Sequence, residues 1–218
     1  MKIHNFEQRT EDWYNIRKGK MTASNADTII ANGKGLETYI YNLMAEYYSS
    51  AEKENYINAD MQRGIDLEPE ARLEFEFYTD LDVQEVGFIE YNEFIGVSPD
   101  GLVGDDGLIE IKCPNDSIYF KLLLSNNIKP EYIAQMQMQM YVTDRQYCYF
   151  VSYNPNFEKS LYIKKINRDE EMIDKLKKGL ERGTELIKEI KKNFRKVGTN
   201  GKILWCNRWS EKGWIGCR

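Results

Sequence analysis

The chain has 218 residues, 42% of them hydrophobic, which is enough for a single globular domain with one substantial core. A formal net charge of −5 argues weakly against a general nucleic-acid coat protein but does not exclude a nuclease with a local basic groove. The single histidine, His4, argues against a Ser-His-Asp triad, a His-Glu-x-x-His zinc site and a histidine-activated cysteine. Any catalysis is therefore expected to use carboxylates, lysine or a metal ion.

Targeting and redox features favour a cytoplasmic protein. No run approaches the roughly 18 apolar residues that cross a bilayer, and the first residues lack the charged-then-apolar pattern of a signal peptide. The cysteines contain no Cys-x-x-Cys pair, which favours reduced thiols over a zinc site or a disulfide framework. They lie at Cys113, Cys148, Cys206 and Cys217.

The N-terminal part of the chain is expected to be mainly helical. Residues 10–19 begin with a threonine followed by acids, continue with apolar positions at helical spacing and end at a glycine, which is typical of a short capped helix. A second short helix is expected to begin near Thr22, and a third is expected over residues 36–48.

Residues 59–79 also show helical periodicity. Pro69 is expected to start a turn or to bend this helix, because proline lacks a backbone donor. Glu68, just before it, has the simple alternative of an acid in the first turn of a helix. The apolar side chains predicted to lie near one face are Leu67, Ala71, Phe75 and Tyr78.

After residue 80 the periodicity changes to that of strands. Strands are expected at 83–90, 94–97 and 108–112, separated by glycine-rich turns that suit hairpins. A helix is then predicted over 130–142, strands over 147–153 and 161–166, and a long charged helix over 168–196. This order predicts the α/β class, with a mixed central β-sheet flanked by helices and a core over about residues 10–196. The segment after it, with three tryptophans, is assigned no role.

The strand over 108–112 carries two charged residues on one side. Because side chains alternate along a strand, Glu110 and Lys112 project to the same face, while Ile109, Ile111 and Cys113 project to the other. Glycines at 101, 104 and 107, together with Pro99, are expected to turn the chain so that Asp100 approaches Glu110. Ser98 shares a side with Asp100 if that segment stays extended.

Two carboxylates that meet in this way repel each other, and a hard divalent cation such as Mg²⁺ relieves the repulsion. Lys112 beside such an ion could orient or deprotonate a water molecule, or neutralise charge on a phosphorus centre. The simpler alternative is a hairpin turn followed by a solvated strand face with alternating charges. The spacing alone leaves both interpretations open.

Four motifs in a fixed order carry a resemblance to a known family. The chain resembles the PD-(D/E)xK nuclease superfamily, and in detail the YqaJ-type viral recombinase nucleases typified by the phage lambda exonuclease. The resemblance covers residues 10 to about 155 and implies a restriction-endonuclease-like core. Its motifs are Trp13, Arg17, Gly19 and Thr22-Ala23-Ser24; Gly64, Glu68, Ala71 and Arg72; Ser98-Pro99-Asp100-Gly101 with Glu110-Ile111-Lys112; and Tyr132, Ala134, Gln135, Gln137, Met140, Val142 and Thr143.

The resemblance implies a role for each of these positions. Asp100 and Glu110 would hold Mg²⁺, for which Mn²⁺ would substitute, together with the backbone carbonyl of Ile111, and Glu68 would be a further acidic ligand, directly or through water. Lys112 would act on the attacking water. Gln135 would pack against that lysine or bond the water. Arg17, Ser24 and Ser98 would bind a 5′-phosphate of DNA.

The resemblance also implies the activity and the partners. Such a nuclease digests one strand of linear double-stranded DNA from its 5′ end, releases mononucleotides and leaves a 3′ overhang for a single-strand annealing recombination protein. A homo-oligomer, as a ring, trimer or tetramer, would enclose the DNA in a phage or prophage context. The basic residues of the last predicted helix are candidates for the DNA-facing surface, although pairing with its own acids explains them equally well. They are Lys175, Lys177, Lys178, Lys188, Lys191, Lys192, Arg195 and Lys196.

Two other functions use the same residues. A structure-specific or restriction-type endonuclease would need the same Asp, Glu and Lys but no clamp for a terminal phosphate, and it would cut closed circles. A non-catalytic DNA-end-binding module would bind duplex DNA without metal-dependent cleavage. The cysteines lack the close spacing that an iron–sulfur relative needs.

Overall fold

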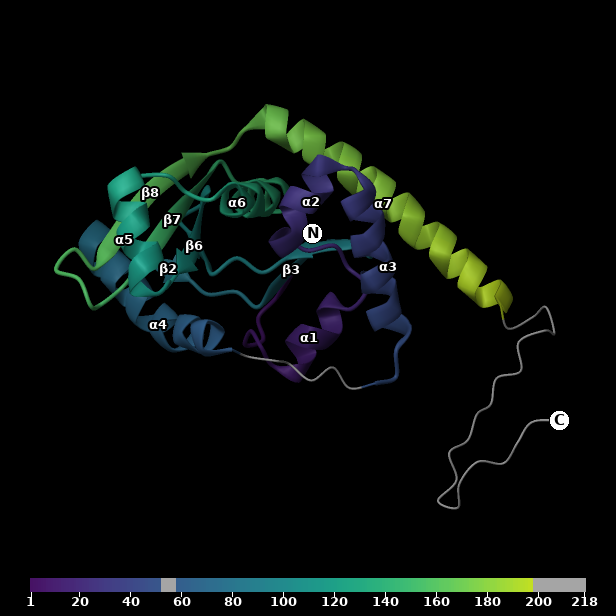
Figure 1. Cartoon of the computed structure of the whole chain (residues 1–218), viewed down its shortest axis with the longest axis horizontal. Helices are drawn as coiled ribbons and strands as arrows, with labels where there is room; N and C mark the ends of the chain where they lie inside the picture. Colours follow the sequence, from purple (N-terminus) through teal and green to yellow (C-terminus); the bar gives the residue numbers. More distant parts are fainter. Residues whose placement is uncertain (52–57, 198–218) are drawn as a thin grey trace, which may run out of the picture.

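The computed structural model describes residues 1–51 and 58–197, which form two β-sheets among helices (Figure 1). The strands are β1 (Lys2–His4), β2 (Val83–Gln84), β3 (Phe88–Asn92), β4 (Ile95–Val97), β5 (Gly101–Val103), β6 (Gly107–Lys112), β7 (Tyr147–Tyr153) and β8 (Leu161–Asn167). The helices are α1 (Glu11–Arg17), the 3₁₀ turn η1 (Ala23–Asn25), α2 (Ala26–Ala31), α3 (Lys34–Tyr48), α4 (Ala59–Thr79), α5 (Asp116–Ser125), α6 (Pro130–Thr143) and α7 (Glu170–Val197).

The larger sheet has the strand order β2-β5-β6-β7-β8. Strands β6 and β7 are parallel, and the other neighbours in this sheet are antiparallel. The smaller sheet, β1-β3-β4, is antiparallel throughout. The predicted mixed sheet flanked by helices is therefore confirmed.

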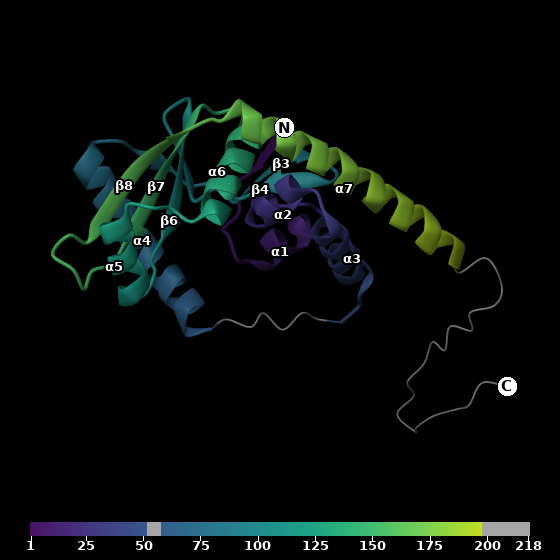
Figure 2. The ribbon, with the colours of Figure 1, turned by 45° about the horizontal axis from the view of Figure 1, so that its top comes forward.

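Helices cover both faces of the larger sheet. On one face α4 packs over Ile109, Ile111 and Val151 of β6 and β7. On the other face α6 packs over Leu108 and Phe150, which belong to the larger of two hydrophobic clusters. Figure 2 shows α6 between the sheet and the layer formed by α2, α3 and α7. Alternation along β6 thus directs its even-numbered side chains toward α6 and its odd-numbered ones toward α4.

The single strand expected over 83–90 is wrong, because the chain forms two strands there. Strand β2 pairs with β5 in the larger sheet, whereas β3 pairs with β1 and β4 in the smaller one. Gly87 lies between them, where a Cβ atom would come 2.1 Å from the carbonyl oxygen of Phe6. Only glycine permits this close approach of two backbones, and it lies at the point where the chain passes from the larger sheet to the smaller one.

Two expectations for α4 also differ from the structure. Pro69 lies inside a continuous helix of 21 residues that begins at the cap Asn58, so Glu68 is not in a first turn. Tyr78 is 77% exposed, whereas Ala71 and Phe75 of the same predicted face are fully buried. Pro69 therefore does not start a new turn, and the core contact of the helix ends before its last residues.

Three elements have no counterpart in the sequence-based prediction. Strand β1 pairs with residues far along the chain, and β5 has three residues, too few to show alternation. Helix α5 begins at Asn115, whose side chain accepts a hydrogen bond from the backbone N–H of Ile118 at 3.2 Å. Within residues 1–51 and 58–197, no helix combines the length and apolar content needed to cross a membrane. The tryptophan-containing C-terminal segment, with Cys206 and Cys217, lies outside the described residues.

Candidate active site

Strand β6 presents Glu110 and Lys112 to helix α6, and Glu110 is only 1% exposed. The Glu110 carboxylate forms an ion pair with the Lys112 ammonium group. Its two oxygens also accept hydrogen bonds from Nε2 of Gln135 at 2.5 Å and from Nε2 of Gln139 at 2.7 Å. A solvated strand face would leave this carboxylate in water. That alternative is therefore wrong, and the buried carboxylate has a fixed orientation.

Lys112 remains a cation in this setting. Burial alone would lower the pKa of Lys112, but the negative charges of Glu110 and Asp100 outweigh burial and raise it. Its ammonium group also lies 5.2 Å from the centre of the Tyr132 ring. Lys112 can consequently donate hydrogen bonds and stabilise negative charge, but it does not accept a proton while both carboxylates are ionised.

Asp100 lies where the chain passes from the smaller sheet to the larger one. The register of β5 with β6 pairs Gly101 with Ile109, which brings Asp100 next to Glu110. Oδ2 of Asp100 accepts a hydrogen bond from the backbone N–H of Ile111 at 2.6 Å. Burial raises the pKa of Asp100 well above its ordinary value, and the charges of Glu110 and Glu68 raise it further.

The turn that delivers Asp100 differs from the expected one in two respects. Gly104 alone of the three glycines has a left-handed backbone, with φ of 54°, and Gly101 and Gly107 are strand residues. Residues 98–100 lie between β4 and β5 and belong to no strand, so the alternation expected to relate Ser98 to Asp100 does not apply. Ser98 instead contacts residues of α1.

The donor set at this point fits a hard divalent cation. Asp100 and Glu110 supply carboxylate oxygens, and burial, followed by the charges of Glu110 and Glu68, raises the pKa of Asp100, which a bound cation would oppose. The N–H of Ile111 points toward Asp100, and the carbonyl of a strand residue points to the same side as its N–H. Among the described residues, no group of three or more His, Cys, Asp or Glu side chains could hold a metal ion. The fit is thus to two carboxylates, one carbonyl and water.

Glu68 lies at the edge of this set. Its carboxylate accepts hydrogen bonds from Arg9 at 2.6 Å and from Arg72 at 3.1 Å, and it contributes to the raised pKa of Asp100. Two guanidinium groups therefore already balance its charge. In this arrangement Glu68 could reach a bound ion only by exchanging one of these partners, or through water.

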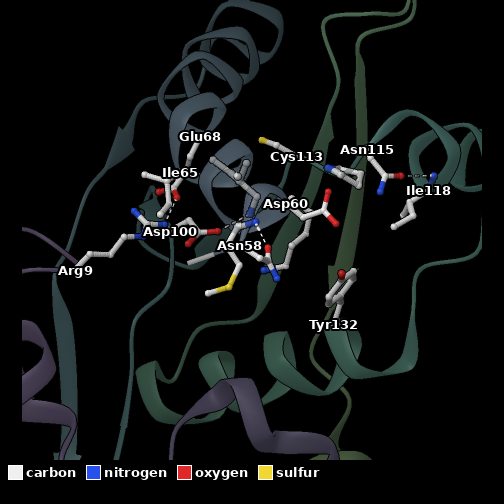
Figure 3. A pocket seen from close by; sticks show the side chains of 15 residues that line it. Arg9, Asn58, Asp60, Ile65, Glu68, Asp100, Cys113, Asn115, Ile118 and Tyr132 are labelled. Carbon is white, nitrogen blue, oxygen red and sulfur yellow. Dashed lines mark hydrogen bonds and ion pairs between the residues drawn. The ribbon is translucent and has the colours of Figure 1, made fainter. Parts of the chain in front are cut away.

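A cavity of about 480 Å³ opens over the carboxylates (Figure 3). Asp100, Ile111 and Lys112 line it from the sheet side. Its other walls come from α4, the start of α5 and the ring of Tyr132 on α6. The residues that complete the lining are Arg9, Asn58, Asp60, Met61, Gly64, Ile65, Glu68, Cys113, Pro114, Asn115 and Ile118. The acidic site is therefore open to a ligand.

A second cavity, of about 350 Å³, surrounds the Arg17 guanidinium group. This group lies 4.0 Å from the centre of the Trp13 ring, and its Nη1 donates to Oγ of Ser98 at 3.3 Å. Nε1 of Trp13 donates to the same oxygen at 2.9 Å. Burial lowers the pKa of Arg17 to about 10, which leaves it charged at neutral pH. The exposed Ser24 lines the same cavity.

The structure groups the site residues named from the sequence in two places. Glu68, Asp100, Ile111 and Lys112 line the first cavity, and Glu110 and Gln135 are joined to it through the ion pair of Glu110 with Lys112. Arg17 and Ser24 line the second cavity, and Ser98 contacts Arg17. Residues 98–100 connect the two, since Ser98 contacts Arg17 and Asp100 faces the acidic site. The basic side chains of α7 line neither cavity. Two of them, Lys188 and Lys191, lie over the ring of Phe94.

Three contacts at the site were not expected from the sequence. Gln139 could have been found, because it follows Gln135 by four residues and therefore shares its helix face. Trp13 was recognised as a motif residue, but its hydrogen bond to Ser98 was not expected. Arg9 has no local signal at all, since its partner Glu68 is 59 residues away.

Replacing Gln139 by methionine is expected to lower activity about 10-fold, because Glu110 then loses one of the two amide donors that orient it. Loss of a buried hydrogen bond should also cost about 1–3 kcal/mol of stability. Steady-state rates and urea unfolding would measure both effects. The matched control is Gln137→Met, because Gln137 bonds Asn167 and Asp169 instead. If both variants lose activity only in proportion to unfolded protein, Gln139 has no specific effect on the site.

Comparisons with known proteins identify the family of this chain. The model of the YqaJ-like viral recombinase domain family matches residues 12–146. An alkaline exonuclease from Laribacter hongkongensis has 38% sequence identity and a TM-score of 0.79, and the alignment covers 87% of this chain and 99% of that one. The same figures hold for its complex with dAMP.

A more distant solved structure shares the fold. A phage-related exonuclease from Haemophilus somnus 129PT has 20% identity and a TM-score of 0.58, over 83% of this chain and 98% of that one. No curated protein sequence matches the chain. The family match extends over more than half of the 218 residues and includes Arg17, Glu68, Asp100, Glu110, Lys112 and Gln135. The chain belongs to the YqaJ-like viral recombinase family.

Proposed function

We propose that this protein is a Mg²⁺-dependent 5′-to-3′ exonuclease that digests one strand of linear double-stranded DNA to mononucleotides. The observation that carries the proposal is the buried Glu110, paired with Lys112 beside Asp100 at an open cavity, with Ser98, two residues before Asp100, bonded to Arg17. The relative from Laribacter hongkongensis, described as an alkaline exonuclease, supports the reaction class. Its complex with dAMP supports a mononucleotide product.

The residues of this chain would divide the chemistry as follows. Asp100, Glu110 and the carbonyl of Ile111 would hold Mg²⁺, which supplies an activated water and polarises the phosphate when bound. Gln135 and Gln139 keep Glu110 oriented by hydrogen bonds to its two oxygens. Lys112, a cation, donates hydrogen bonds to the oxygens on which negative charge grows during attack.

The direction of digestion would follow from the Arg17 cavity. A guanidinium fork binds a phosphate by paired donors, and Ser24 and Ser98 add hydroxyl groups. Ser98 and Asp100 are two residues apart, so their backbones are separated by at most about 7 Å. That separation is on the scale of one nucleotide. A 5′-phosphate in the Arg17 cavity would therefore place the next phosphodiester at Asp100, and each cut would release one mononucleotide.

The products would define the partners. Digestion from the 5′ end leaves a 3′ single-stranded overhang, which a single-strand annealing recombination protein would bind. A homo-oligomeric ring, as a trimer or tetramer, would keep the enzyme on its DNA. These two elements rest on family membership alone, in the setting of phage-type homologous recombination.

Replacing Arg17 by alanine is expected to slow digestion of a 5′-phosphorylated duplex by about 10- to 100-fold, because a charge-assisted contact to phosphate is lost. Digestion of a 5′-hydroxyl duplex should change little, since that end lacks the charge Arg17 would bind. Initial rates on the two substrates measure the difference. Arg17→Lys is the matched variant, which keeps the charge but not the fork and should recover part of the loss. Equal slowing on both ends would remove the basis for a terminal-phosphate clamp.

A further inference from the structure

The side chain of Arg9 lies between two neighbouring cavities and lines both. Its Nη2 lies 2.6 Å from Oε2 of Glu68, and its side chain remains 39% exposed. Arg9, Glu68 and Asp100 line both the active-site cavity and a neighbouring one of about 440 Å³. Figure 3 shows Arg9 reaching from the N-terminal segment toward Glu68 and Asp100. The guanidinium group therefore lies where a DNA strand entering either cavity would pass.

The backbone of Arg9 is fixed, although its side chain is partly free. Gln8 donates hydrogen bonds to the carbonyls of Pro99 and Val86, both at 3.0 Å, and Thr10 caps α1. Arg9 itself has a left-handed backbone with φ of 68°. A residue other than glycine pays an energetic penalty there, and such residues gather at ligand-binding sites. The segment thus holds Arg9 at this wall through its neighbours.

The two arginines that bind Glu68 differ in their freedom. The Arg72 side chain is 12% exposed, lies on the same helix as Glu68 and also pairs with Glu85 at 2.6 Å. It is therefore fixed in place. Arg9 comes from a different segment and is more than three times as exposed. If Arg9 leaves, Glu68 still keeps Arg72 as a partner.

We propose that Arg9 is a DNA-phosphate-binding residue, which the free protein holds on Glu68 and which is released to the DNA when a divalent cation occupies the acidic site. This inference rests on the proposed nuclease function. A cation held beside Asp100 would attract the carboxylate of Glu68 and would repel the guanidinium group of Arg9. A phosphate of the entering strand is then the strongest acceptor within its reach, and a guanidinium fork matches it. Cation binding and DNA binding are thereby coupled through one side chain.

The test is the affinity for a blunt duplex end in Ca²⁺ and in EDTA, with DNA integrity checked on a denaturing gel. In Ca²⁺, Arg9→Ala is expected to bind about 10-fold more weakly than wild type, with a salt slope smaller by about 1. In EDTA the affinities of the two proteins should agree within about twofold, because the guanidinium group of Arg9 stays bound to Glu68 and does not contact DNA. Alanine adopts the same left-handed backbone at a similar penalty, so the comparison isolates the side chain.

Two variants complete the design. Arg9→Lys keeps the charge and should recover part of the affinity in Ca²⁺. Lys165→Ala removes one charge from an exposed position on β8 that lines neither cavity, and its effect should be the same in both buffers. Equal weakening of Arg9→Ala in Ca²⁺ and in EDTA, or no weakening in either, would overturn the proposed release.

Failure of this inference can be told apart from failure of the proposed function. If wild type digests linear DNA in Mg²⁺ while Arg9→Ala binds DNA like wild type in Ca²⁺, the Arg9 proposal alone is wrong. If wild type neither digests DNA nor binds duplex ends more tightly in Ca²⁺ than in EDTA, both proposals are wrong.

Discussion

Replacing Lys112 by alanine is expected to slow hydrolysis of linear duplex DNA by about 10³-fold, because the cation that stabilises the developing charge is removed. The same change leaves the buried carboxylate of Glu110 without its ionic partner. Gln135 and Gln139 still bond both carboxylate oxygens, so the fold should persist with reduced stability. Initial rates under saturating Mg²⁺, with circular dichroism as a check on folding, measure the effect.

The control for Lys112 is a lysine of the same charge outside the site. Lys165→Ala, on the exposed side of β8, should keep a rate within about twofold of wild type, since the rings that Lys165 contacts, those of Tyr147 and Tyr149, line neither cavity. A Lys112→Ala protein that is folded and cleaves within threefold of wild type would exclude Lys112 from the reaction.

Replacing Asp100 by asparagine is expected to abolish activity, with a loss of about 10³-fold or more, and to stabilise the cation-free protein at the same time. Because the pKa of Asp100 is raised in the folded state, ionising it opposes folding. This penalty begins as the pH rises through the ordinary pKa of an aspartate, about 4. It reaches its full size above the raised pKa that Asp100 has in the folded protein. In EDTA at neutral pH the variant should therefore have a higher melting temperature than wild type. For a chain of this size, each kcal/mol of removed ionisation penalty corresponds to a rise of about 2–4 °C.

Calorimetric melting across a pH series, with EDTA or Mg²⁺, tests this second prediction. The two proteins should converge below about pH 4, where the carboxyl group becomes protonated in both states. Mg²⁺ should raise the melting temperature of wild type and leave that of Asp100→Asn unchanged. Asp105→Asn, in an exposed turn, serves as the charge-matched control and should behave like wild type. A variant less stable than wild type in EDTA at neutral pH would contradict the raised pKa of Asp100.

Local patterns predicted the elements whose determinants lie within them. The Thr10 cap, the periodicity of α4 and the alternation along β6 each depend on residues close in sequence. Alternation on β6 was sufficient to separate Glu110 and Lys112 from Ile109 and Ile111, which do pack on opposite faces. The glycine-rich segment between them and the motif order related Asp100 to Glu110.

Long-range contacts account for what the sequence did not predict. The break at Gly87 depends on the approach of the Phe6 backbone, more than 80 residues earlier, and β1 forms only against β3. Burial of Glu110 depends on two glutamines of α6, so alternating charges on a strand looked the same as a solvated face. Arg9 reaches Glu68 only because the N-terminal segment lies against α4 in the folded protein.

The central claim is that Asp100, Glu110 and Lys112 hydrolyse DNA from a free end. The most direct test compares a linear duplex labelled at a 5′ or a 3′ end with a covalently closed circle, in Mg²⁺ and in EDTA, for wild type and Lys112→Ala. We expect wild type in Mg²⁺ to release the 5′ label at once as a mononucleotide, to keep the 3′ label on shortening strands and to leave the circle intact. EDTA and Lys112→Ala should each stop the reaction. Cutting of the circle as fast as the linear form would instead show an endonuclease, and firm binding without cleavage would show that these residues form no catalytic site.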